Sequence, residues 1–296
     1  MCRHFGGSFA ASAIRRPGSP VNRAGRNGPA CHRPDVDANP TRPTKGAPSL
    51  WPKEHGAYAM LLFPLVCALL LVRGALPALV LALGVVLAFL AHEPLLVLLG
   101  RRGPRALRAL GASARPRLAL LASLAVALGV LGLWLAPVAL HAVVLPLVLA
   151  LLVGVAMATG REKTLGGELL VSAAFASACV PLGVAGRASQ GSMGVVALVW
   201  FLTFALEALA VKATLSRLKG KLPVLLVAAA VLPLALLVLC VLLASSLSTA
   251  LLALVPACVA SFLLALVHVH PRKLRVVGWA LVGTDAAVLL ALLLLR

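Results

Sequence analysis

Acidic residues are scarce in this 296-residue chain, which has eight Asp and Glu against 27 Lys and Arg. Charged residues of both signs make up only 12% of the chain, and aromatic residues only 4%. So little charge excludes an ordinary soluble domain, whose surface needs about twice as much. The shortage of aromatic residues argues against a transmembrane β-barrel, whose strands carry aromatic girdles.

Metal-binding cysteine patterns are also missing. The six cysteines show no Cys-x-x-Cys and no Cys/His metal spacing. Cys2 and Cys31 lie near the N-terminus, and the other four fall singly inside apolar runs, where we interpret them as small buried apolar residues. The net charge of +19 does not indicate nucleic-acid binding, because Lys and Arg lie in short segments between apolar runs, where they set membrane topology.

Apolar residues dominate the chain, at 61% of the sequence with a mean hydropathy of +1.05. From Trp51 onward they form runs of the length that crosses a bilayer. The sequence therefore predicts an all-α, polytopic transmembrane helical bundle over residues 51–296, embedded in a lipid bilayer. We expect nine spans, at about 56–73, 75–99, 117–135, 138–158, 165–186, 193–215, 222–244, 247–268 and 276–295.

Residues 1–50 have a different composition, rich in Arg, Pro, Gly, Asn and Ser. They hold too little apolar surface to form a core, so we expect a disordered tail. No apolar segment follows its charges, and we expect no secretory signal there.

Basic residues alternate between the two sides of the predicted bundle. They are concentrated in the connections after the second, fourth, sixth and eighth spans, whereas the other connections hold only Arg73 and Arg187. The positive-inside rule then predicts a multi-pass membrane protein with a cytoplasmic N-terminus and an external C-terminus.

Most ionisable side chains of the predicted spans fall at their cytoplasmic ends. Such groups are costly in a bilayer and often mark a site, so we predict a polar pocket near the cytoplasmic leaflet. The candidate catalytic residues, as metal or acid/base groups and proton carriers, are His55, His92, Glu93 and Glu207. The candidate substrate-binding residues are Lys53, Glu54, Gly56, Arg161, Glu162, Lys163, Glu168, Lys212 and Asp285. The pattern does not identify a metal or a cofactor.

Simpler interpretations remain open for several of these residues. Glu93 and Glu207 could each pair with a loop arginine at the headgroup level. His268 and His270 could be interfacial anchors at the end of a span. Asp285 is expected about 15 Å deep in the last span, where it either forms a site or joins helices.

The segment Pro-Lys-Glu-His-Gly-Ala-Tyr-Ala-Met at residues 52–60 resembles the opening signature of the YwiC-like family of bacterial membrane proteins. Three later segments are also similar to that family: His92-Glu93-Pro94, the loop 160–168 and His270-Pro271-Arg272. The resemblance implies a polytopic protein of the bacterial inner membrane, with His55 and Gly56 at shared positions, and no particular reaction.

A looser resemblance is to the UbiA-type prenyltransferase superfamily, in span number and in the polar clusters after the second and sixth spans. The resemblance implies aspartate-rich motifs after the second and sixth spans, which in those enzymes hold magnesium and an isoprenoid diphosphate. Here the places hold His92 and Glu93, and Glu207 with Lys212, without Asn-x-x-x-Asp or Asp-x-x-x-Asp. Single glutamates are poor magnesium ligands.

Three functions therefore stay open from the sequence. The first is a degenerate UbiA-like enzyme that acts on a lipidic substrate at the cytoplasmic pocket. The second is a small-molecule or ion transporter with a site at Asp285 in the middle of the membrane. The third is a non-catalytic membrane assembly protein.

Overall fold

The computed structural model describes residues 55–161, 163–218, 223–244, 249–267, 270 and 274–295. Within these residues every regular element is a helix, and the helices belong to one compact unit. The predicted tail and the predicted turn at Ser245 and Ser246 lie outside the described residues. In chain order the elements are α1 (His55–Leu71), α2 (Leu76–Leu98), α3 (Pro104–Leu135), η1 (Pro137–Ala139), α4 (Leu140–Thr159), α5 (Leu165–Ser177), α6 (Cys179–Ala185), α7 (Gln190–Leu218), α8 (Pro223–Ala244), η2 (Thr249–Leu254), α9 (Val255–Leu266) and α10 (Leu274–Leu294).

Eight apolar helical segments of the described chain are long enough to cross a bilayer, and the shorter Gly56–Leu71 is the ninth. The predicted all-α bundle of nine spans is thereby confirmed. Large apolar side chains cover the outside of α3, α4 and α8, for example Trp134, Leu151 and Leu242. Water would not tolerate so much exposed apolar surface, so these faces contact lipid.

Two predicted spans have a different extent in the structure. Helix α3 starts at Pro104 instead of residue 117, because Ala, Leu and Arg are good helix formers and Pro104 suits the first helical position. The fifth span is broken between α5 and α6. Pro181 has no N–H to bond the carbonyl of Ser177 four residues earlier, which explains the break at Ala178.

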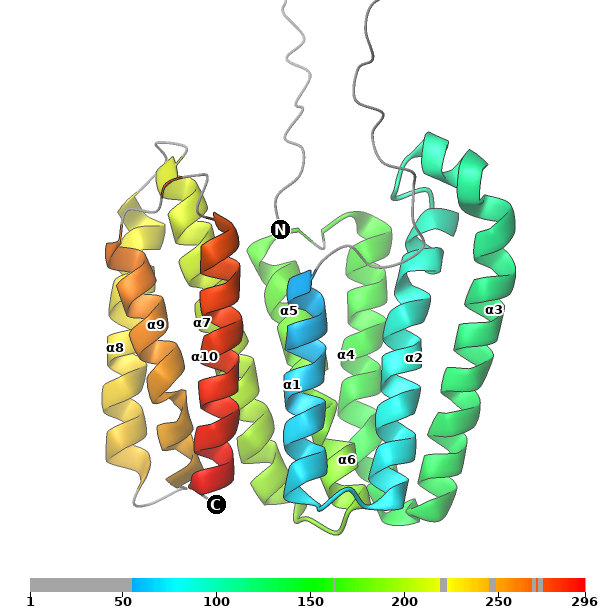
Figure 1. Ribbon diagram of the computed structural model, residues 1–296, viewed down its shortest axis with the longest axis horizontal. Helices are drawn as coiled ribbons and strands as arrows, with labels where there is room; N and C mark the ends of the chain where they lie inside the picture. Colours follow the sequence, from blue (N-terminus) through cyan, green and yellow to red (C-terminus); the bar gives the residue numbers. More distant parts are fainter. Residues whose placement is uncertain are drawn as a thin grey trace, which may run out of the picture. The chain divides into compact units, whose positions relative to one another are not determined.

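Small residues allow close helix packing in the first half of the chain. Helices α2 and α3 lie side by side (Figure 1). At Gly132 an added Cβ atom would lie 2.6 Å from the Leu81 side chain, so only glycine fits without movement there. Close approach over small residues is a usual way to pack helices in lipid.

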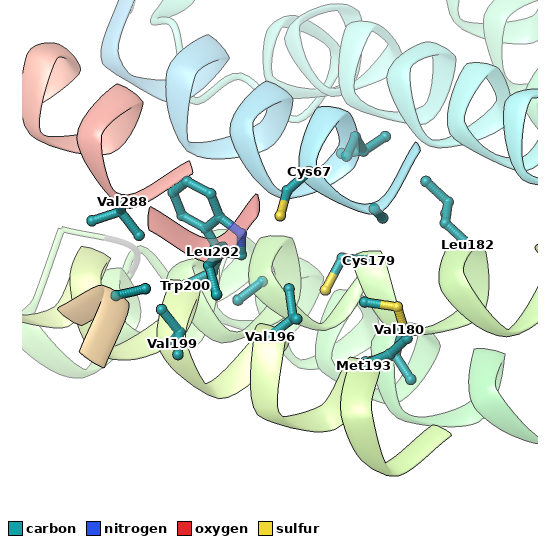
Figure 2. Packing of buried hydrophobic residues seen from close by; sticks show 14 of the residues in the cluster. Cys67, Cys179, Val180, Leu182, Met193, Val196, Val199, Trp200, Val288 and Leu292 are labelled. Atoms are coloured by element: carbon teal, nitrogen blue, oxygen red, sulfur yellow. The ribbon is translucent and has the colours of Figure 1, made fainter. Parts of the chain in front are cut away.

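The second half packs around α7, which contacts α5, α8, α9 and α10. The main apolar core lies where α1, α6, α7 and α10 meet, and Figure 2 shows part of it. Val196, Val199 and Trp200 of α7 belong to this core together with Val288 and Leu292 of α10.

The two ends of the bundle differ in charge. We call the end with the connections after α2, α4, α7 and α9 the arginine-rich end, since it holds Arg101, Arg102, Arg161 and Arg217. The opposite end has the connections after α1, α3, α6 and α8, where the described basic residues are Arg73 and Arg187. Both of these adopt positive φ, at 53° and 70°, in tight turns.

Candidate functional site

Glu207 and Asp285 lie near the middle of the helices that carry them. Glu207 is eleven residues before the end of α7 at Leu218, and Asp285 is eleven residues after the start of α10 at Leu274. Both of these helix termini are at the arginine-rich end, so each carboxylate lies about 16 Å from it at 1.5 Å per residue. Glu207 is therefore deeper than its predicted place near the cytoplasmic leaflet.

The two carboxylates are neighbours across the contact between α7 and α10. Asp285 is close enough to act electrostatically on Glu207. Glu207 is 8% exposed and Asp285 2%, which removes both from lipid and water.

Neither carboxylate is fully satisfied by the protein. Oε1 of Glu207 and Oδ1 of Asp285 are buried without a hydrogen-bond partner among the described residues. Thr284, next to Asp285, donates its hydroxyl to the Ala280 carbonyl at 3.1 Å instead of to the carboxylate. The protein thus holds two buried acids with oxygen atoms available to a ligand.

Three further buried side chains of the described chain also have a polar atom without a hydrogen-bond partner. The atoms are Nε1 of Trp200, Oγ1 of Thr203 and Oγ of Ser261, from α7 and α9. Trp200, Thr203 and Glu207 share one face of α7, since they are spaced by three and four residues. Trp200 and Thr203 were not among the predicted site residues. Their spacing from Glu207 was the signal in the sequence that could have identified them.

The eighth span changes from a 3₁₀ helix to an α-helix at the same depth as the two carboxylates. The 3₁₀ helix η2 gives way to α9 at Val255, eleven residues before Leu266 at the arginine-rich end. Pro256 follows at once and cannot donate a backbone hydrogen bond. Since α9 packs against both α7 and α10, an interrupted helix lies beside the acidic pair.

At the arginine-rich end, the other predicted acids form ion pairs. Nη2 of Arg102 lies 2.5 Å from Oε2 of Glu93, whose side chain is 5% exposed. This matches the simpler interpretation of Glu93 as the partner of a loop arginine. Nε2 of His92 lies 2.9 Å from the Met157 sulfur of α4. His92 also stacks on Phe89, with ring centroids 6.5 Å apart.

The loop 160–168 acts mainly as a helix connection. Gly160 ends α4 in the left-handed conformation, with φ of 75°. Thr164 caps α5, and its Oγ1 accepts a hydrogen bond from the Gly167 amide at 3.1 Å. Lys212 of α7 reaches this connection, with Nζ 3.1 Å from Oε1 of Glu168 and 3.3 Å from the Lys163 carbonyl oxygen.

The described residues of the predicted pocket make different contacts in the structure. No hydrogen bond or ion pair joins Glu207 to His92 or Glu93 within the described part of the chain. Gly56 and Arg161 are exposed. Lys53, Glu54, Glu162 and His268 lie outside the described residues, as does the side chain of His55. A single pocket of His55, His92, Glu93 and Glu207 therefore stays a prediction.

A cavity of about 200 Å³ lies at the opposite end of the α7–α10 contact. Its lining comes from the first turns of α7, the end of α10, η2 and α1, and consists of Leu71, Ser192, Met193, Val196, Thr249, Ala250, Leu292 and Leu295. Apolar core residues separate it from the acidic pair, namely Val199, Trp200 and Val288. Nowhere in the described chain do three His, Cys, Asp or Glu residues group as metal ligands.

The fold and its buried ionisable groups define a multi-pass α-helical membrane protein. Residues 51–182 match the model of the YwiC-like protein family, which confirms the family resemblance over these residues. Residues 183–296, which carry Glu207, Asp285 and the segment at His270, lie beyond the match. No curated protein and no solved structure matches the chain. The likeness to UbiA-type enzymes thus gains no support and stays a prediction.

Proposed function

We propose that the protein is a cation transporter in which the Glu207–Asp285 pair binds a proton or a metal cation and exchanges the two across the membrane. The observation that carries the proposal is the burial of both carboxylates as neighbours, each with an oxygen lacking a hydrogen-bond partner among the described residues. Ionisable groups inside a membrane bundle commonly mark ion pathways.

Electrostatics requires something to neutralise the pair. Two carboxylates about 5 Å apart repel by about 3 kcal/mol at an effective dielectric constant of about 20. Desolvation adds several kcal/mol for each uncompensated charge. The pair therefore takes up a proton or a cation, and a site that accepts either one couples their movements.

The polar residues of α7 suggest from which end the ion arrives. The face of Glu207 continues through Thr214 to Arg217 at the arginine-rich end, with buried Ala210 as the apolar position between them. In the other direction Trp200 and Val196 are packed in the apolar core. We therefore assign the structure to a conformation that is closed toward the opposite end, as alternating access requires.

The enzyme hypothesis has less support from the described residues. Both described carboxylates at the arginine-rich end, Glu93 and Glu168, are neutralised by Arg102 and Lys212. Acid/base chemistry there would have to use Glu207, which lies deeper and beside Asp285. An assembly protein would gain nothing from two neighbouring buried acids, because they oppose folding.

Cation/proton exchange can be measured in proteoliposomes that carry an acidic interior and the dye pyranine. Addition of Na⁺, K⁺ or Ca²⁺ outside is expected to raise the interior pH for at least one of the cations. Glu207→Gln and Asp285→Asn should each abolish the response. Ser123→Ala, which removes an exposed hydroxyl on α3, is the matched control and should respond as the unmodified protein does. Exchange that survives in both amide variants would contradict the proposal.

A further inference from the structure

The buried cysteines, which fall singly in the sequence, form two neighbouring pairs in the fold. Cys67 of α1 lies close enough to Cys179 of α6 for their thiol groups to interact electrostatically. Cys258 of α9 is related to Cys240 of α8 in the same way. All four are buried, and Cys67 and Cys179 have no exposed surface at all.

A third sulfur lies beside the first pair. Met193, in the first turn of α7, packs so closely on α6 that a Cβ atom at Gly183 would overlap its sulfur. Gly183 is four residues after Cys179, hence one turn further along the same face of α6. Figure 2 shows the side chains of Cys67, Cys179 and Met193 in the same part of the core. Three helices therefore each contribute one sulfur-bearing side chain to this part of the core.

A cavity at the opposite end of the bundle is lined by one of these three sulfur-bearing residues. The cavity of about 200 Å³ has Met193 in its wall, and Leu71, one turn after Cys67, is also part of the lining. Exposed Ser192 and Thr249 lie at its rim. A small ion that enters the cavity can reach Met193, whereas Cys67 and Cys179 are buried behind the lining residues.

We infer that Cys67, Cys179 and Met193 form a binding site for a soft monovalent cation of the Cu⁺ or Ag⁺ class. Thiolate and thioether ligands select such ions, whereas hard cations prefer oxygen. Charge balance favours the same class. On binding, one thiol releases its proton to solvent and becomes a thiolate, while the second stays a neutral thiol. The thiolate and the monovalent cation are then neutral together and can remain in an apolar core. Zn²⁺ usually takes four ligands in a structural site and would leave excess charge here.

Binding can be measured with purified full-length protein in nanodiscs, kept anaerobic. A Cys2→Ser/Cys31→Ser background removes the two thiols of the N-terminal region. This protein is titrated against Cu⁺ held by bicinchoninate, whose absorbance falls as Cu⁺ moves to the protein. We expect one Cu⁺ per chain, its loss in Cys67→Ser/Cys179→Ser, and an affinity about tenfold lower in Met193→Leu. Zn²⁺ should not compete.

The second thiol pair supplies the matched control. Cys240→Ser/Cys258→Ser should bind Cu⁺ as the background protein does. Loss of binding in that variant, or no uptake by the background protein, would overturn the inference. X-ray absorption of the Cu⁺-loaded background protein keeps the test valid if a cysteine variant misfolds. It should show only sulfur ligands, and nitrogen or oxygen ligands would also overturn the inference.

Discussion

Glu207 of α7 and Asp285 of α10 are neighbours within the bundle, at equal distances along their helices from the arginine-rich end. The two residues come from spans that are far apart in the sequence, and each retains an oxygen that no described group binds. Their placement puts two buried carboxylates in the middle of the α7–α10 contact, beside the apolar core.

The acidic pair is expected to oppose folding when no cation is bound. Glu207→Gln and Asp285→Asn keep the side-chain shape and remove one of the repelling charges. An uncompensated buried charge costs several kcal/mol, and each amide variant removes one such charge. Thermal unfolding in detergent without added cations should therefore give unchanged or higher midpoints. Lower midpoints for both variants would show instead that the pair joins the helices.

The Arg102–Glu93 ion pair is expected to matter more for stability than the Lys212–Glu168 pair. Arg102→Ala leaves the nearly buried Glu93 carboxylate without this partner, at a cost of about 1–3 kcal/mol. Lys212→Ala breaks a pair whose side chains are 24% and 20% exposed, with a cost below about 1 kcal/mol. Urea unfolding of the two variants measures both losses of stability. Equal losses would show that the difference in burial does not decide how much each ion pair contributes.

Close packing of α2 on α3 predicts different outcomes for two nearby glycines. Gly132→Ala places a methyl group 2.6 Å from Leu81 Cγ and Cδ2, so the helices must separate and the unfolding temperature should fall. Gly129→Ala, one turn earlier on α3, meets nothing within 4 Å. It should be neutral, or stabilising by up to about 1 kcal/mol through helix propensity. Equal effects of the two substitutions would contradict the packing.

The charge difference between the two ends predicts the orientation in the membrane. Reporter fusions after Gly103, at the arginine-rich end, should be active in the cytoplasm. Fusions after Arg187 or Arg296 should be active only outside. Cytoplasmic activity of the Arg296 fusion would overturn either the count of nine spans or the direction of insertion.

The number and kind of the elements could be predicted from the sequence, because apolar run length alone fixes a membrane helix. Their interruptions were harder to predict, since the break at Ala178 depends on one proline, Pro181, inside an apolar run. The sequence offered an ion pair with a loop arginine as one of two interpretations of Glu93. The partner, Arg102, is only nine positions away.

The relations between distant spans could not be predicted. The sequence placed Glu207 with the acids of the cytoplasmic pocket and Asp285 by itself in the last span. Their contact depends on which helices pack together and at which register. The same holds for Cys67 and Cys179, on α1 and α6. Helix order in a bundle is fixed by packing over whole faces, which no local pattern of residue spacing describes.

The most direct test of the acidic pair is labelling with dicyclohexylcarbodiimide, which reacts with protonated carboxyl groups in apolar surroundings. Peptide mass spectrometry of labelled protein in nanodiscs should find the adduct on Glu207 or Asp285, with less adduct when the exchanged cation is present. Asp285→Asn and Glu207→Gln locate the reactive group. If neither residue is labelled, or if added cations leave labelling unchanged, the pair does not bind protons and cations in competition.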